Sequence, residues 1–204
     1  MSRMVPSVAS SDCAALAELA NRTQLHNWTY ARGWLSDPNC CDWELVGCDT
    51  AGRVTLLALS FNGLRGVLPA SIARLSALQD LDLEYNALTG PLPDLSPLTQ
   101  LVQLGLGGNA FTAAHPSLCS LRATRGPACD LSGNFFSCPL PDCNLDKTCQ
   151  ATCIGAHLRS GEESVRGGTV SRGSSSRPVR RLPVKPADSE AAGPVRWPAV
   201  RSVP

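Results

Sequence analysis

Apolar residues recur in a fixed pattern through the middle of the chain and predict a stack of similar coils. Four segments carry an apolar residue, any residue and a leucine, then an asparagine, a further apolar residue and a proline: residues 56–69, 81–93, 104–116 and 129–141. Their asparagines, Asn62, Asn86, Asn109 and Asn134, are spaced 24, 23 and 25 residues apart. A repeat of this length is typical of solenoids, in which no single unit buries its apolar face and neighbouring units must stack.

Each unit should contribute one short strand to a parallel sheet. Alternate residues of a strand point to the same face, so equivalent apolar residues of successive units should form columns. The predicted columns are Leu57, Leu81, Leu104 and Cys129, then Leu59, Leu83, Leu106 and Leu131, then Leu64, Leu88, Phe111 and Phe136. The asparagines should be structural, because an amide supplies donors and an acceptor for backbone groups left open where each strand ends.

Both ends of such a stack need a cap, because an exposed core end invites aggregation. Asp12 fits the N-cap of a helix that would cover the first coil. The amphipathic stripe of this helix consists of Leu16, Leu19, Ala20 and Thr23. The other cap should lie at residues 119–153, which hold six of the ten cysteines.

The cysteine content indicates an oxidising compartment, because ten cysteines, an even number, fit persistent disulfides. Two tripeptides, at Asn21 and Asn27, match the acceptor site for N-glycosylation. The first residues lack the apolar core of a signal peptide, so we expect either that the first exon is missing from the sequence or that export is unconventional. No stretch approaches the roughly 18 apolar residues of a membrane span. The expected location is extracellular or in the cell wall, with membrane attachment only if the chain is a fragment.

The stretch CCDWELVGCDTAGRVTLLALS, residues 40–60, resembles the N-terminal cap signature of plant-type leucine-rich-repeat proteins, and the repeats resemble the N-x-L-x-G-x-L-P units of that family. The resemblance covers residues 12–143 and implies an α/β repeat solenoid, a short right-handed coil with a concave parallel sheet. The disulfides that it implies are Cys13–Cys40 and Cys41–Cys48. It leaves open how the later cysteines pair: Cys119, Cys129, Cys138, Cys143, Cys149 and Cys153. Their spacing does not match structural zinc knuckles, so we expect neither a metal nor a cofactor.

Five segments follow from these patterns. They are a disordered leader at 1–11, the N-terminal cap at 12–53, three repeats at 54–125, a degenerate fourth repeat with a Cys-rich cap at 126–153, and a disordered tail at 154–204. The tail carries nine Lys or Arg against four Asp or Glu and few large apolar residues, which predicts disorder. Its role stays open between a solvated linker, weak contact with acidic polysaccharide, membrane surface or nucleic acid, and a basic P-x-x-P ligand at residues 180–186.

The outward residues of the strands give the candidate binding surface. Members of the resembled family bind proteins, peptides or glycans on the concave face, where this chain should present Phe61, Asp80, Asp82, Glu84, Tyr85 and Gln103. Acids beside aromatic anchors suit a basic partner, although acids also solvate an exposed strand. The face is on the order of 300 Å² by strand spacing, whereas a standard interface takes about 800 Å² from each partner.

We therefore interpret the chain as a non-enzymatic recognition module in extracellular signalling or defence. It would bind a protein or peptide, alone or as co-receptor to a larger receptor, with polysaccharide as a further partner and nucleic acid not expected. The chain lacks a nucleophile with a base, a phosphate loop and a pair of acids with a reason to shift their pKa, which argues against an enzyme. Two alternatives stay open: an inhibitor of a secreted polysaccharide hydrolase, and the truncated ectodomain of a receptor-like membrane protein.

Overall fold

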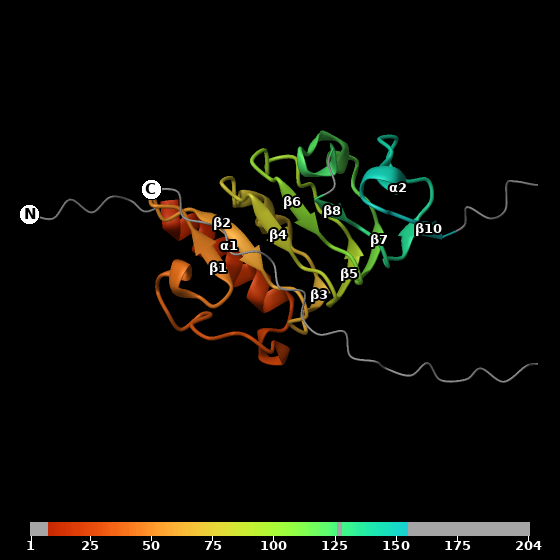
Figure 1. Ribbon diagram of the computed structural model, residues 1–204. Helices are drawn as coiled ribbons and strands as arrows, with labels where there is room; N and C mark the ends of the chain where they lie inside the picture. The colour runs from red at the N-terminus through yellow and green to blue at the C-terminus, as the bar shows by residue number, and fades with distance from the viewer. Residues whose placement is uncertain (1–7, 126–127, 155–204) are drawn as a thin grey trace, which may run out of the picture. The chain divides into compact units, whose positions relative to one another are not determined.

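The computed structural model describes residues 8–125 and 128–154, in which the repeats stack as parallel coils (Figure 1). A five-stranded sheet has the order β1 (Val46–Cys48), β2 (Val54–Ala58), β4 (Asp80–Asp82), β6 (Gln103–Gly105) and β8 (Cys129–Asp130). The last four strands are parallel, and β1 joins the edge antiparallel to β2. Leu57 lies opposite Leu81, and Leu104 lies between Leu81 and Cys129, so the first predicted column is confirmed.

A second sheet, which the sequence analysis did not predict, forms where the chain turns back after each asparagine. It is parallel and has the order β3 (Arg65–Val67), β5 (Ala87–Pro91) and β7 (Ala110–Ala113). The third predicted column, Leu64, Leu88, Phe111 and Phe136, is fully buried along this sheet and the strand that follows it. The rest of the coils contains the 3₁₀ turns η3 (Ala70–Arg74), η4 (Pro116–Ser120) and η5 (Ala123–Arg125). Each coil thus closes its core between two short strands.

The helix of the N-terminal cap begins earlier than expected. Helix α1 (Val8–Arg22) already includes residues 8–11, so the predicted leader is too long and Asp12 is not the N-cap. Asp12 is buried instead, and its Oδ2 accepts a hydrogen bond of 3.0 Å from the amide of Val54 at the start of β2. A buried carboxylate needs such a partner, which explains why this acid faces the core. The predicted stripe of the helix is fully buried.

Three tryptophans fill the cap between α1 and β1, together with the 3₁₀ turns η1 (Leu25–Asn27) and η2 (Cys40–Asp42). The ring centroids of Trp28 and Trp34 are 4.7 Å apart, and those of Trp34 and Trp43 are 4.9 Å apart. Each indole nitrogen donates to a backbone carbonyl oxygen. The rings can be buried because each indole nitrogen is satisfied, and they extend the core of the repeats into the cap.

Disulfides close both ends of the stack. The N-terminal pairs are Cys13–Cys40 and Cys41–Cys48, the two that the family resemblance implies. The C-terminal pairs are Cys119–Cys143, Cys129–Cys149 and Cys138–Cys153. They join η4 to the segment before α2 (Leu145–Thr148), and β8 to the residue after α2. The third joins the residue after β9 (Phe136–Ser137) to β10 (Cys153–Ile154). Each C-terminal bridge starts inside the loop of the one before it, so the described segment up to residue 154 is tied to the stack at three points.

Two further sequence predictions concern the outside of the chain. Asn21 and Asn27 are both exposed, so the folded chain leaves room for a glycan at each. The predicted basic tail, apart from Ile154, lies outside the described residues. Across residues 8–125 and 128–154, the helices are too short or too polar to span a bilayer.

Candidate binding surface

The turns that end the strands of the five-stranded sheet are locked by the asparagine column. The Asn86 side-chain nitrogen donates to the carbonyl oxygens of Leu59 at 2.8 Å and Leu83 at 3.0 Å. Its side-chain oxygen accepts from the amides of Asn62 at 3.1 Å and Leu64 at 3.0 Å. The next two asparagines of the column bond their neighbours in the same way. The column therefore fixes the position of the residue before each asparagine.

Two aromatic residues occupy these positions in the first two repeats. Phe61 and Tyr85 have φ angles of 52° and 51°, in the left-handed region that bulky side chains rarely adopt. Their rings stack with centroids 4.4 Å apart and planes at 16°, yet they stay 65% and 54% exposed. The Tyr85 ring also covers Gly108, because a Cβ on that glycine would lie 2.7 Å from the ring. Backbone strain and exposed rings both cost free energy, and such strain concentrates at binding sites.

Glycines on and after β6 leave room for carboxylates from both neighbouring strands. A Cβ on Gly105 would lie 2.8 Å from Glu84 Oε1 and 3.1 Å from Asp82 Oδ1. A Cβ on Gly107 would lie 3.0 Å from the carboxylate of Asp130. Gly105 and Gly107 thus form a surface without side chains, here called the glycine floor, over which acids of the second and fourth repeats approach each other.

The crowded carboxylates shift the protonation of Glu84. Partial burial, and then the charges of Asp82 and Asp130, raise the pKa of Glu84 from its usual 4.5 to about 7. Burial also raises the pKa of Asp80. Asp82 accepts a hydrogen bond of 3.0 Å from the amide of Glu84, which holds the two acids close together. A proton or a cationic partner relieves this repulsion.

We call this surface the sheet face. It comprises the outward side chains Phe61, Asp80, Asp82, Glu84, Tyr85, Gln103 and Asp130. All six residues that the sequence analysis proposed for binding lie on it. Asp82, Glu84 and the aromatic pair are adjacent, whereas Asp80 and Gln103 lie opposite each other nearer the start of their strands.

Asp130 is the residue that the sequence analysis missed. It precedes Leu131 and lies four positions before the asparagine of its repeat, as Asp82 does in the second repeat. That equivalence was visible in the sequence. The glycines between the two repeats concealed its importance, because their missing side chains let acids two strands apart act on the same group.

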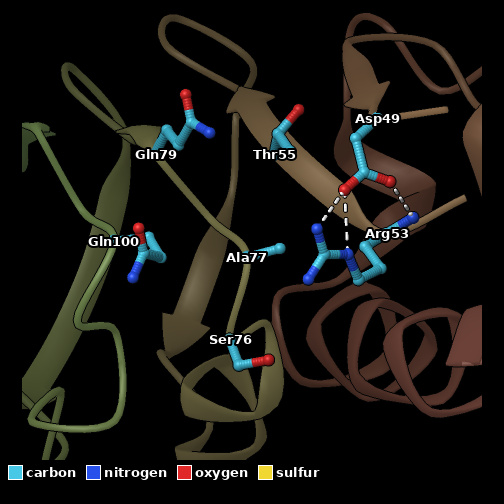
Figure 2. Close-up of a pocket in the computed structure, with 7 residues that line it drawn as sticks. All are labelled: Asp49, Arg53, Thr55, Ser76, Ala77, Gln79 and Gln100. Atoms are coloured by element: carbon cyan, nitrogen blue, oxygen red, sulfur yellow. Dashed lines mark hydrogen bonds and ion pairs between the residues drawn. The ribbon is translucent and has the colours of Figure 1, made fainter. Parts of the chain in front are cut away.

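A second feature lies where the strands begin. A polar hollow of about 270 Å³ is lined by Asp49, Arg53, Thr55, Ser76, Ala77, Gln79 and Gln100. Figure 2 shows the ion pair of Asp49 and Arg53 on one side of the hollow and the two glutamines on the other. The hollow lies between the hairpin after β1 and the segments that lead into β4 and β6.

The chain is similar in sequence to known leucine-rich-repeat proteins of plants. Residues 52–111 match the family model for the leucine rich repeat. Receptor-like protein 6 of Arabidopsis thaliana is 37% identical over 109 residues, which are 51% of this chain and 11% of that protein. Polygalacturonase inhibitor 1 of Oryza sativa subsp. japonica is 38% identical over 77 residues, which are 37% of this chain and 22% of that protein. Residues 52–111 are therefore leucine-rich repeats, and the chain is similar in sequence to plant receptor-like proteins.

Solved leucine-rich-repeat structures of plant receptor kinases share the fold of the described residues. The ectodomain of the receptor kinase SOBIR1 from Arabidopsis thaliana is 28% identical with a TM-score of 0.51, over 64% of this chain and 71% of that one. The Arabidopsis receptor kinase HAESA, solved with the peptide hormone IDA and the co-receptor SERK1, is 25% identical with a TM-score of 0.55, over 64% of this chain and 22% of that one. The described residues are thus related to receptor ectodomains, while the chain spans only a small part of the full-length relatives.

Proposed function

We propose that this protein is a non-enzymatic recognition module that binds a peptide, or an extended segment of a protein, carrying Arg or Lys. The observation that supports the proposal is the sheet face itself. Its carboxylates lie beside an exposed aromatic pair, and the ion pairs found among residues 8–125 and 128–154 join other groups, Arg53 with Asp49 and His115 with Asp94. A cation at the glycine floor would face Glu84 and Asp130 and could also contact an aromatic ring.

The size of the surface favours a short partner. Strand spacing gives on the order of 300 Å², so a folded protein would need additional contacts to reach the about 800 Å² per partner of a standard interface. An extended peptide needs less area, because a few anchored side chains carry most of its binding free energy. The solved complex of HAESA with a peptide hormone supports a peptide for this fold. The five disulfides and the relation to receptor ectodomains support an extracellular location.

Selection from a random peptide library tests the proposal. The full chain is immobilised, phage-displayed dodecapeptides are selected on it, and the enriched peptides are measured by calorimetry. We expect the peptides to be rich in Arg or Lys with an apolar neighbour. At about pH 8, where Glu84 is mostly ionised, the paired substitution Asp82→Asn and Glu84→Gln should weaken them roughly tenfold, since it removes two attractive charges while conserving side-chain size. Tyr85→Ala should weaken them separately, because it removes the aromatic contact.

A matched control separates local recognition from net charge. Asp142→Asn with Asp146→Asn removes the same charge from exposed positions in the C-terminal cap. This control should bind the selected peptides as the unaltered chain does. Equal binding by the sheet-face variant and the control would refute recognition through the sheet face.

Inhibition of a polysaccharide hydrolase is a second candidate, favoured by the 38% identity to Polygalacturonase inhibitor 1. A polygalacturonase would be assayed for release of reducing ends with increasing concentrations of the full chain. Saturable inhibition that the sheet-face variant loses would support this function. Full activity at a large excess of the chain would exclude it for the enzyme tested.

A receptor role is a third candidate, because the chain aligns with 11% of Receptor-like protein 6. In that case the sheet face would serve as part of a longer ectodomain or as a co-receptor contact. Sequencing of full-length transcripts tests this, since a reading frame that continues into a membrane span would establish it.

A further inference from the structure

The polar hollow at the start of the strands is built separately from the sheet face and has a different chemistry. Its lining residues offer a guanidinium, a carboxylate, two primary amides and two hydroxyls, while Ala77 is the one apolar side chain among them. Lipids and aromatic ligands need apolar walls, which this hollow does not provide. A ligand that fits must instead exchange many hydrogen bonds with water for hydrogen bonds with the protein.

One wall of the hollow is rigid. Asp49 accepts backbone hydrogen bonds of 2.9 Å from Ala51 and Arg53, so its carboxylate is held at the tip of the hairpin. The same carboxylate accepts from the Arg53 side chain, at 2.8 Å from Nε and 2.6 Å from Nη2. These bonds lower the pKa of Asp49, so the pair stays ionised. The remaining guanidinium protons of Arg53 are available to a ligand, because a guanidinium carries five donors.

The opposite wall presents amides without a partner. Within the described part of the chain, the side chains of Gln79 and Gln100 form no hydrogen bond, and both are exposed at the hollow (Figure 2). The backbone beneath Gln79 is fixed, since its amide donates to Thr55 at 2.9 Å and its carbonyl oxygen accepts from the following repeat at 2.8 Å. An amide has two donors and an acceptor, so each glutamine can bind a hydroxyl group in either sense.

The charge of the hollow points to a neutral ligand. Asp49 and Arg53 neutralise each other, and no other lining residue is charged. Many hydroxyl groups, no net charge and little apolar surface are together the chemistry of a sugar. The volume of about 270 Å³ lies just under the range of typical small-molecule pockets, which limits the ligand to about one ring.

We propose that this hollow binds a neutral carbohydrate through one pyranose or furanose ring, held between the Asp49–Arg53 pair and the amides of Gln79 and Gln100. This site uses different side chains from those proposed for peptide binding on the sheet face. A ligand of this size with no apolar contact has a millimolar dissociation constant, so a polymer would gain affinity from several copies rather than from one site.

Titration of the full chain followed by NMR tests the site. The side-chain amide signals of Gln79 and Gln100 are recorded while glucose, galactose, mannose, xylose and arabinose are each added to 50 mM. We expect at least one sugar to shift both signals saturably. The double substitution Gln79→Ala and Gln100→Ala removes the reporters, so backbone signals of the flanking residues report on that variant. It should weaken binding at least fivefold without loss of folding, because both side chains are exposed and unbonded.

The control is Thr112→Ala, an exposed polar residue on the second sheet, which should bind the sugar as the unaltered chain does. An oligosaccharide that binds more tightly than its monosaccharide would identify the end of a polymer as the source, and equal binding would identify a free sugar; both support the site. Absence of a saturable shift for every sugar overturns the proposal. Equal binding by the glutamine variant, or binding of galacturonate alone, overturns it as well.

Discussion

The asparagine column makes the sharpest prediction about stability. Replacing Asn86 with alanine removes the bonds that its amide nitrogen donates to three carbonyl oxygens, those of Leu59, Leu83 and Glu84. It also removes the two bonds that its oxygen accepts, from the amides of Asn62 and Leu64. The two backbone amides belong to buried residues and lose their acceptor at a site to which water has only partial access. The methyl group of alanine carries no acceptor to replace the lost oxygen.

The expected cost follows from the two stranded amides. A buried donor without a partner costs about 1–3 kcal/mol, and the carbonyl oxygens lose less because they have two lone pairs. Partial access of water places the sum at about 3 kcal/mol. That is a large part of the stability of a domain, which is about 5–15 kcal/mol.

Denaturation in urea with the disulfides intact measures the free energy of unfolding of each variant. Far-UV circular dichroism follows the repeats, and the slope against urea concentration should stay unchanged. Gln100→Ala is the control, because it deletes an exposed amide that has no hydrogen-bond partner in the described residues, and it should change stability by less than about 0.5 kcal/mol. A loss below about 1 kcal/mol for Asn86→Ala would refute the structural role of the column.

Three further predictions follow from single residues. Gly66→Ala should destabilise the protein by about 3 kcal/mol or more in the same assay, because φ is +119° and the new Cβ would overlap the carbonyl oxygen of Arg22 at the end of α1. Gly52→Ala, at φ +75° with no atom close to the new Cβ, should cost only about 1 kcal/mol of backbone strain. Glu84 has a pKa of about 7 in the folded protein and an ordinary value of 4.5, so the folded state takes up a proton at a higher pH than the unfolded state does. The free energy of unfolding should therefore rise by about 1 kcal/mol, after allowance for solvent screening, as the pH falls from 7 to 4.5. Glu84→Gln should remove this rise. Asn21 and Asn27 should both carry glycans when the chain is secreted from plant cells, seen as a two-step mass loss on deglycosylation.

Each of these has an outcome that would contradict it. Equal losses for the two glycine variants would show that the contact with α1 does not matter. If Glu84→Gln left the pH dependence of the free energy of unfolding unchanged, that dependence would have to come from other acids. If the secreted chain had the mass of the unglycosylated protein, neither Asn21 nor Asn27 would be a glycosylation site.

Some parts of the binding surface followed from the sequence because strand alternation is a local property. Asp82 and Glu84 flank Leu83, so burying the leucine forces both acids outward. The convergence of Glu84 and Asp130 did not follow, because it depends on the register of three strands and on the glycines between them. The raised pKa of Glu84 is therefore a property of the stack rather than of its repeat.

The sequence by itself determined the number of coils, the buried columns and the existence of caps. A single repeat cannot bury its leucines, so the repeats must stack and cover each other, and the two ends of the stack must be capped. The tertiary structure alone decided the second sheet, the C-terminal disulfide pairing, the burial of Asp12 and the polar hollow. Each of these joins residues from different coils or from a coil and a cap. Such contacts depend on distances across the stack, which the order of residues along the chain does not specify.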